Sequence, residues 1–256
     1  MMNLIEVKNL SIQFGGLTAV DNVSFAIKPN EIFGLIGPNG AGKTTVFNML
    51  SGFYQADHGE IIFNGNTITD LKPHTINRLG IARTFQNIRL FKGLSVVENV
   101  IVALQQREKH TWLDSLLETK KFYQTEKILF EHSIALLKIF ELDRYKNHLA
   151  NALPYGAQRK LEIVRALATQ PKLLMLDEPA AGMNHSEKAE LNDLVRFIKN
   201  KFQLTILIIE HDMKVIMNIC DRIVVLHRGQ KIAEGVPLDI KASPPVIEAY
   251  LGKRIT

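Results

Sequence analysis

The sequence has little that would place this chain outside the cell or inside a membrane. Cys220 is its only cysteine, so no disulfide can form within the chain, which is typical of a protein in a reducing cytoplasm. No apolar run reaches the roughly 20 residues of a membrane-spanning helix. Residues 1–7 lack the basic start, apolar core and cleavage site of a signal peptide. We therefore expect a cytoplasmic protein in which Cys220 is a buried structural thiol.

The sequence also lacks internal repeats, low-complexity segments and a strong excess of one charge. Its formal net charge is +5 and its pI about 9.2 over 256 residues, with lysine and arginine spread along the chain. This mild basic bias favours an ordinary solvated surface over a nucleic-acid patch, and weak attraction to anionic lipid headgroups fits equally well. The length and the 46% hydrophobic content allow one large domain or a domain with a substantial insertion.

What the sequence does contain is a complete phosphate-binding pattern, G-x-x-x-x-G-K-[ST]. The pattern and the threonine after it comprise Gly37, Pro38, Asn39, Gly40, Ala41, Gly42, Lys43, Thr44 and Thr45. An apolar strand pattern over 31–36 precedes the loop and a helical pattern begins at 46, which is the context that this loop needs. We expect backbone N–H groups and the positive end of the helix to bind phosphate. Lys43 would bridge the β- and γ-phosphates, and the Thr44 hydroxyl would ligate Mg²⁺.

Polar groups that suit hydrolysis follow other predicted strands. Asp177 and Glu178 come after the apolar residues 173–176, and His211 comes after the apolar run 205–209 and Glu210. We expect Asp177 to hold Mg²⁺ through water, Glu178 to orient the attacking water, and His211 to contact the γ-phosphate. Gln86 ends a predicted strand over 81–85, where its amide could ligate Mg²⁺, although its spacing alone favours an ordinary surface glutamine.

The remaining patterns alternate between strands and helices. Alternation of apolar and polar residues predicts strands over 5–10, 23–27 and 59–65, whereas the spacing over 95–149 is helical. Later helices are predicted over 157–168, 186–201 (with Ser186 as N-cap) and 246–251, and later strands over 223–226 and 231–233. The sequence therefore predicts an α/β fold with a helical insertion.

The order of these motifs resembles the nucleotide-binding domain of ABC transporters over nearly the whole chain, 1–256. This resemblance implies a P-loop NTPase fold with an N-terminal antiparallel β subdomain, a RecA-like parallel-sheet core, an α-helical insertion over 87–151 and a short C-terminal extension over 236–256. In it, residues 37–45 correspond to the Walker A loop and 173–178 to Walker B with its catalytic Glu178. Phe14 corresponds to the aromatic residue that stacks on adenine, Gln86 to the Q-loop glutamine that reaches Mg²⁺, and His211 to the switch histidine.

The segment 153–159 occupies the place of the family signature but departs from it. The family pattern implies that Pro154, Tyr155, Gly156 and Ala157 face the ATP of a second ATPase, with each ATP sandwiched between two such domains. Pro154 replaces a serine, so a hydroxyl and a backbone N–H are lost, whereas Gly156 and the following helix N-terminus remain to bind an anion. Asn184 replaces the usual D-loop aspartate. Our hypothesis is that this chain binds its own ATP with competent Walker motifs but offers a weakened signature to the ATP of its partner. This suits a pair with a different ATPase subunit.

A closer resemblance is to the LivG-type ATPases of branched-chain amino acid importers. It is carried by residues 80–91, the variant signature 153–156, the segment 179–184 and the closing residues 248–252. It implies ATP and Mg²⁺ as cofactors, two membrane permease subunits, an indirectly coupled periplasmic or extracellular binding protein, and a place on the cytoplasmic face of the inner membrane. Trp112 and Leu113 in the insertion could contact a membrane subunit, although packing within the insertion is the favoured interpretation.

Several alternatives remain open at this point. A related ABC ATPase for import of urea or short amides, or for lipopolysaccharide export, has a similar sequence, but an exporter is expected to have an intact serine signature. A soluble ATPase switch acting on DNA or ribosomes usually has a long coiled coil or two tandem ATPase units, and neither is present here. A kinase would transfer phosphate to a hydroxyl, whereas Glu178 and His211 favour water. We therefore predict a transport ATPase with no nucleic-acid partner.

Overall fold

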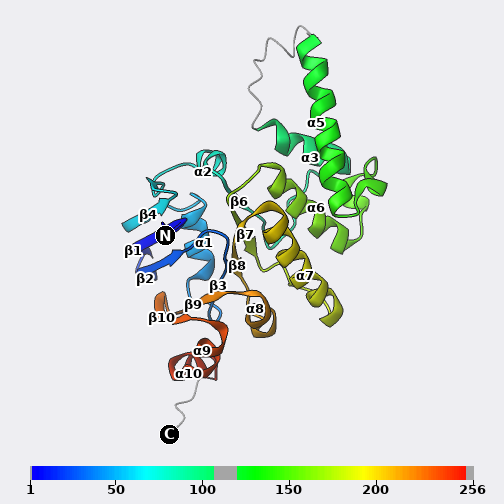
Figure 1. Cartoon of the computed structure of the whole chain (residues 1–256). Helices are drawn as coiled ribbons and strands as arrows, with labels where there is room; N and C mark the ends of the chain where they lie inside the picture. Colours follow the sequence, from blue (N-terminus) through cyan, green and yellow to red (C-terminus); the bar gives the residue numbers. More distant parts are fainter. Residues whose placement is uncertain (1, 107–119, 252–256) are drawn as a thin grey trace. The chain divides into compact units, whose positions relative to one another are not determined.

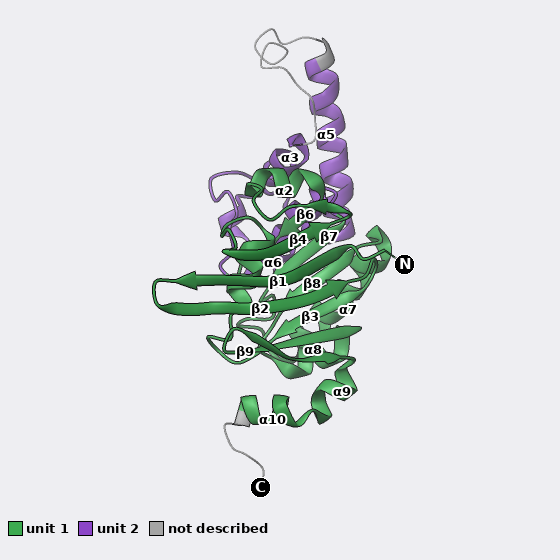
Figure 2. Cartoon of the chain, turned by 90° about the vertical axis from the view of Figure 1, so that its left-hand side faces the viewer, with its two compact units in different colours: residues 1–86, 172–256 green, residues 87–171 purple. Residues whose placement is uncertain are grey.

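The computed structural model describes residues 2–106 and 120–251, and Figure 1 colours the chain along its sequence. The chain forms two compact units. One comprises residues 1–86 and 172–256, and the other comprises residues 87–171 (Figure 2). Trp112 and Leu113 lie outside the described residues.

The first unit contains a four-stranded antiparallel sheet with the order β2-β1-β4-β5. Its strands are β1 (Ile5–Phe14), β2 (Leu17–Ile27), β4 (His58–Phe63) and β5 (Asn66–Thr67). Val7 of β1 lies opposite Phe25 on one side and Ile61 on the other, and all three are buried. The predicted alternation therefore places one face of this sheet in the core, and the expected antiparallel subdomain is confirmed.

The first unit also contains a six-stranded sheet with the order β10-β9-β3-β8-β7-β6. Its strands are β3 (Ile32–Ile36), β6 (Ile81–Arg83), β7 (Leu173–Asp177), β8 (Thr205–Ile209), β9 (Arg222–His227) and β10 (Gln230–Gly235). All neighbours are parallel except β9 and β10. Every residue of β3, β7 and β8 is buried, as is typical of parallel strands covered on both faces. Because Asp177 lies opposite Ile209 and Ile209 opposite Leu35, the residues after these three strands emerge at one edge.

Helices complete the first unit. They are α1 (Lys43–Leu50), α2 (Pro73–Leu79), α7 (His185–Phe202), α8 (Met213–Ile219), α9 (Pro237–Ala242) and α10 (Pro244–Leu251). The N-cap predicted for α7 is wrong, because Asn184 and not Ser186 caps this helix. The Asn184 side chain accepts the Glu187 N–H at 3.0 Å, and the Glu187 carboxylate accepts the Asn184 N–H at 2.8 Å. This reciprocal pair is a capping box, and it gives Asn184 a structural role of its own.

Cys220 follows α8 and is buried, as predicted. A β-carbon added to Gly34 of β3 would lie 3.0 Å from the Cys220 sulfur, so the thiol packs directly on that strand. Burial raises the pKa of the Cys220 thiol well above its usual range, which makes it an unreactive packing group.

The second unit is helical, as predicted for this part of the chain. It contains α3 (Val96–Gln105), α5 (Lys120–Ile139), the 3₁₀ turns η1 (Asp143–Tyr145) and η2 (Ala150–Ala152), and α6 (Tyr155–Ala168). Helix α3 packs on α5 and on α6, with Val100 and Leu137 fully buried. Ser95 caps α3 in a capping box with Glu98. The predicted insertion ends at residue 151, whereas this compact unit extends to residue 171 and includes α6. None of the helices that the structure describes is both long and apolar enough to cross a membrane.

Candidate nucleotide-binding site

The loop between β3 and α1 is held in shape by close backbone packing. A β-carbon on Gly37 would lie 2.2 Å from the Leu226 carbonyl oxygen, and one on Gly42 would lie 2.6 Å from the Ala19 carbonyl oxygen. Only glycine fits at either position. The Gly229 N–H, from the turn between β9 and β10, donates to the Ala41 carbonyl at 3.1 Å. Strands β2 and β9 therefore fix the path of the loop.

Lys43 lies inside this loop, at the first position of α1. Its ammonium group donates to the carbonyl oxygens of Gly37 at 2.7 Å and Pro38 at 3.0 Å. The side chain is buried, and burial lowers its pKa while the nearby Glu178 carboxylate opposes that shift. The loop thus keeps a desolvated positive charge at the N-terminus of α1, where the helix itself attracts anions.

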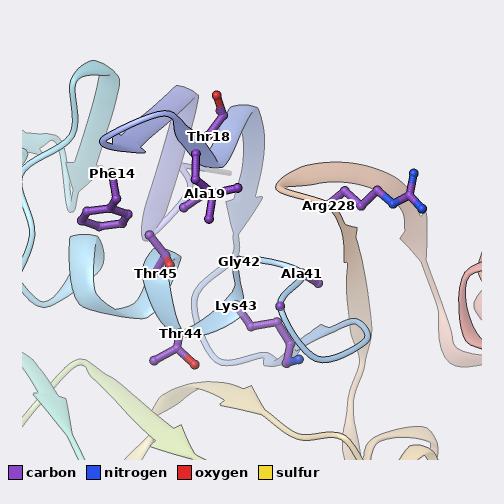
Figure 3. Close-up of a pocket in the computed structure, with 11 residues that line it drawn as sticks. Phe14, Thr18, Ala19, Ala41, Gly42, Lys43, Thr44, Thr45 and Arg228 are labelled. Atoms are coloured by element: carbon purple, nitrogen blue, oxygen red, sulfur yellow. The ribbon is translucent and has the colours of Figure 1, made fainter.

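A cavity of about 590 Å³ opens beside the loop (Figure 3). From the loop, residues 40–45 line it, and from β1 and β2 it is lined by Phe14, Leu17, Thr18 and Ala19. The structure therefore brings Phe14 to the same cavity as Lys43 and Thr44, although about thirty residues separate them in the sequence. The Phe14 side chain is 45% exposed and makes an edge-on contact with Tyr54, their ring centroids 5.2 Å apart. An exposed aromatic ring at the rim is suited to stacking on a planar base.

Arg228 also lines this cavity, and the sequence analysis missed it. It occupies the turn between β9 and β10 and has a left-handed backbone, with a φ of 49°. The Arg-Gly turn at 228–229 is visible in the sequence, but nothing there indicates that it reaches the phosphate loop. The hydrogen bond from Gly229 to Ala41 is what places it there.

Asp177 ends β7, and its carboxylate is paired with a residue that the sequence analysis did not select. An Arg83 guanidinium nitrogen lies 2.7 Å from the Asp177 carboxylate, and both side chains are 8% exposed. The same guanidinium donates to the Asn48 side-chain oxygen at 2.8 Å and to the Ser51 hydroxyl at 2.9 Å. Arg83 therefore ties β6 to the end of β7 and to the second half of α1.

Three aromatic rings surround the Arg83 guanidinium. Its central carbon lies 5.5 Å from the centroid of Phe47, 5.8 Å from that of Phe53 and 5.2 Å from that of Phe85. Such contacts stabilise a desolvated cation. Because Phe85 immediately precedes Gln86, the aromatic cage also reaches the start of the predicted Q-loop.

Glu178, Gln86 and His211 meet at the same edge of the sheet. The Gln86 amide donates to the Glu178 carboxylate at 2.7 Å, and the His211 Nδ1 atom lies 3.8 Å from the same carboxylate oxygen. The His211 side chain is 59% exposed, whereas that of Glu178 is 20% exposed. A carboxylate in contact with an imidazole and an amide can orient a water molecule for attack.

Glu210 is a second carboxylate at this edge that the sequence analysis did not assign a role. It is 1% exposed, and its side chain accepts the Ala180 N–H at 2.7 Å. Burial raises its pKa above the usual range, while the Ala180 hydrogen bond and the nearby His211 oppose that shift. In the sequence, only the position of Glu210 directly before His211 indicates a role for it at this site.

In the second unit, the variant signature forms the start of α6. Pro154 is the N-cap residue of this helix, and no side chain caps its first turn. Pro154, Tyr155 and Gly156 are exposed, and Ala157 is partly buried. The Tyr155 hydroxyl accepts a hydrogen bond from the buried Arg159 at 3.2 Å, which fixes its ring along the helix.

We compared the sequence and the structure with known proteins to identify the family of this chain. Residues 20–181 match the ABC transporter family model, and residues 230–255 match that of the branched-chain amino acid ATP-binding cassette transporter. The chain is 46% identical over 250 residues to the high-affinity branched-chain amino acid transport ATP-binding protein LivG of Escherichia coli strain K12. It is 44% identical over 250 residues to the corresponding protein BraF of Pseudomonas aeruginosa. Both alignments cover 98% of this chain and 98% of the relative.

The fold agrees with that match. The crystal structure of the ADP conformation of MJ1267, an ATP-binding cassette of an ABC transporter, superimposes with a TM-score of 0.84 at 32% identity, covering 99% of this chain and 100% of that one. The predicted P-loop ATPase fold is thereby confirmed, and so is the predicted resemblance. The chain belongs to the ABC transporter family of ATPases, in the group of ATP-binding proteins that includes LivG and BraF.

Proposed function

We propose that this chain is the ATP-hydrolysing subunit of a membrane importer of branched-chain amino acids. The observation that carries the ATPase part is the meeting of Glu178, Gln86 and His211 at the sheet edge that also holds the phosphate loop. The import part rests on the likeness to LivG and BraF, which are named for high-affinity branched-chain amino acid transport. ATP chemistry does not touch the transported solute, so the solute is assigned from that likeness and not from the ATP site.

Each residue of the site then has a defined task. Lys43 exchanges the carbonyl oxygens of Gly37 and Pro38 for the β- and γ-phosphates, because a charge-assisted contact to phosphate is stronger than one to a neutral carbonyl. The loop amides of residues 37–45 and the N-terminus of α1 bind the remaining phosphate oxygens. Phe14 stacks on adenine at the rim of the cavity. Glu178 orients the attacking water, and His211 contacts the γ-phosphate.

Thr44, Asp177 and Gln86 are the residues that would hold Mg²⁺. All three offer oxygen atoms, which Mg²⁺ prefers, and Mg²⁺ is usually bound by one or two carboxylates together with substrate phosphates. When bound, it neutralises charge on the phosphates. The Arg83 guanidinium donates to one Asp177 carboxylate oxygen, and Asp177 would hold the ion through water.

The chain is proposed to work as half of an ATPase pair. The start of α6, with Pro154 to Ala157, would face the ATP held by a second ATPase subunit, and that subunit's signature would complete the site at Lys43 and Glu178. Two permease subunits and a periplasmic or extracellular binding protein would complete the importer, with this chain on the cytoplasmic face of the membrane. The pair is proposed to be non-identical, because Pro154 offers neither a hydroxyl nor an N–H.

The proposal is tested by purifying the chain with an affinity tag from membranes and reconstituting the co-purified complex in liposomes. We expect two permeases and a second ATPase, and ATP-dependent uptake of leucine, isoleucine or valine when the binding protein is added. Uptake of urea or short amides in place of these amino acids would contradict the substrate. Co-purified nucleic acid without membrane subunits would contradict the transport function.

A further inference from the structure

The turn that carries Glu178 holds a backbone conformation that is unfavourable for a residue with a side chain. Glu178 has a φ of 45°, in the left-handed region, which residues other than glycine, asparagine and aspartate seldom adopt. The surrounding structure must therefore hold this turn in place. The orientation of the Glu178 carboxylate depends on the same turn.

Two hydrogen bonds attach this turn to its surroundings. One goes to β8, and the other goes to Glu210, the residue directly after β8. The Glu178 N–H donates to the Ile209 carbonyl at 3.0 Å, which continues the pairing of β7 with β8. The Ala180 N–H donates to the Glu210 carboxylate at 2.7 Å. The first bond joins backbone atoms and does not depend on the Glu210 side chain, whereas the second is made by that side chain.

The same Glu210 carboxylate faces His211. Its other oxygen lies 3.9 Å from the His211 Nδ1 atom and accepts the His211 backbone N–H at 3.3 Å. The Glu178 carboxylate lies 3.8 Å from that Nδ1 atom. The imidazole thus lies between two carboxylates at nearly equal distances, one buried and one at the reacting edge.

A buried carboxylate carries an unfavourable desolvation free energy unless its hydrogen bonds are satisfied. Glu210 is 1% exposed, and its two oxygens are directed to the Ala180 N–H and to His211. We propose that Glu210 is a positioning residue for hydrolysis: it anchors the turn that presents Glu178 and holds His211 on the side facing that carboxylate. This inference rests on the proposed ATPase role of Glu178.

The test compares Glu210→Ala with Glu210→Gln. The glutamine keeps one oxygen for the Ala180 N–H but places its amide nitrogen where the other oxygen accepts the His211 N–H, whereas the alanine leaves both N–H groups without that acceptor. We expect Glu210→Ala to lower kcat at least tenfold with the affinity for a fluorescent ATP analogue changed less than twofold, and Glu210→Gln, which keeps the anchor of the turn, to lose severalfold less turnover. Glu190→Ala, at an exposed position of α7, is the control and should retain both values.

A second measurement separates positioning from general damage. In a Glu178→Gln background, most of the turnover is already lost. Adding Glu210→Ala there should lower the small remaining rate less than twofold, because the effects of substituting residues that act as a unit are not additive. If Glu210→Ala does not fold, Glu210→Leu fills the space without an acceptor and takes its place. Unchanged kcat in the folded variant, equal losses in kcat and affinity, or equal loss in Glu210→Gln would overturn this inference. Absence of ATPase activity in the wild-type complex would instead contradict the proposed function.

Discussion

The starts of α1 and α6 are the two places in this chain where phosphate is expected, and they are built differently. Neither has a side-chain cap, a feature they share with the short helices α2 and α9, whereas α3, α7 and α8 are capped by Ser95, Asn184 and Asp212. An uncapped first turn leaves N–H groups for an anion. At α1 a buried lysine and a rigid glycine loop strengthen the attraction of these N–H groups for an anion. At α6 the residue before the helix is an exposed proline.

In the proposed ATPase pair, this difference makes the start of α1 the strong half of one composite site and the start of α6 the weak half of the other. In the first unit, Lys43 is held by carbonyls of its own loop, Arg83 by contacts to α1 and β7, and Glu178 by contacts to Gln86 and β8. In the second unit, the start of α6 relies on backbone groups and on Tyr155, which Arg159 orients. Four substitutions test this contrast, in order from the largest expected effect.

Glu178→Gln should stop turnover while ATP still binds. The amide keeps the shape of the side chain but cannot act as a base, and loss of general base catalysis reduces rates by about 100- to 10,000-fold. ATPase assays together with equilibrium binding of ATP measure both effects. Hydrolysis at the wild-type rate would show that Glu178 has no catalytic role and would remove the strong half from the comparison.

Arg83→Met should destabilise the first unit by about 3 kcal/mol, because it leaves the buried Asp177 carboxylate without its charged partner. Urea unfolding followed by circular dichroism measures this change. The double variant Arg83→Met with Asp177→Leu removes both charges and should recover part of the loss. A double variant that loses the sum of the two single effects would contradict a coupled pair.

Lys43→Ala should weaken ATP binding by about 2 kcal/mol, or roughly 30-fold, because it removes a charge-assisted hydrogen bond to phosphate. Titration with ATP measures the affinity. Lys241→Ala, at an exposed position of α9, is the matched control and should bind normally. An affinity unchanged by Lys43→Ala would refute the role of the loop as the stronger phosphate site.

Pro154→Ser should have the smallest effect and the opposite sign. It restores a hydroxyl and an N–H at the start of α6, which contribute about 1 kcal/mol at a helix N-cap. In a complex whose own strong site is inactivated by Glu178→Gln, we expect the remaining turnover to rise about fivefold. Pro237→Ser, at the start of α9, is the control and should leave the rate unchanged. If Pro154→Ser leaves this rate unchanged, Pro154 does not weaken the signature side.

Much of the fold could be predicted because buried parallel strands are recognisable as apolar runs. The prediction over 205–209 matches β8 residue for residue, and the phosphate loop is identified by its pattern alone. The short helices α2, α8 and α9 were missed, because six or seven residues show too little periodicity. The cap of α7 was placed on Ser186, although Glu187 stands three residues after Asn184 and completes a capping box with it.

The site residues that sequence reasoning missed act through tertiary pairing. Arg83 and Asp177 are 94 positions apart, and they meet because β6 and β7 are neighbours in register. Arg228 reaches the cavity through the β9–β10 turn, and Glu210 reaches Ala180 across the gap between two strand ends. No local pattern encodes such contacts, because each depends on which strands pair.

One measurement tests the unequal halves most directly. In the purified complex, the catalytic glutamate is changed to glutamine either in this chain, at Glu178, or at the corresponding glutamate of the second ATPase subunit. In the proposed pair, the strong site would contain Lys43 and Glu178, whereas the other site would depend on the segment from Pro154 to Ala157. The substitution in this chain should therefore abolish most ATP turnover, and the substitution in the other subunit should leave most of it. Equal losses from the two substitutions would contradict the account.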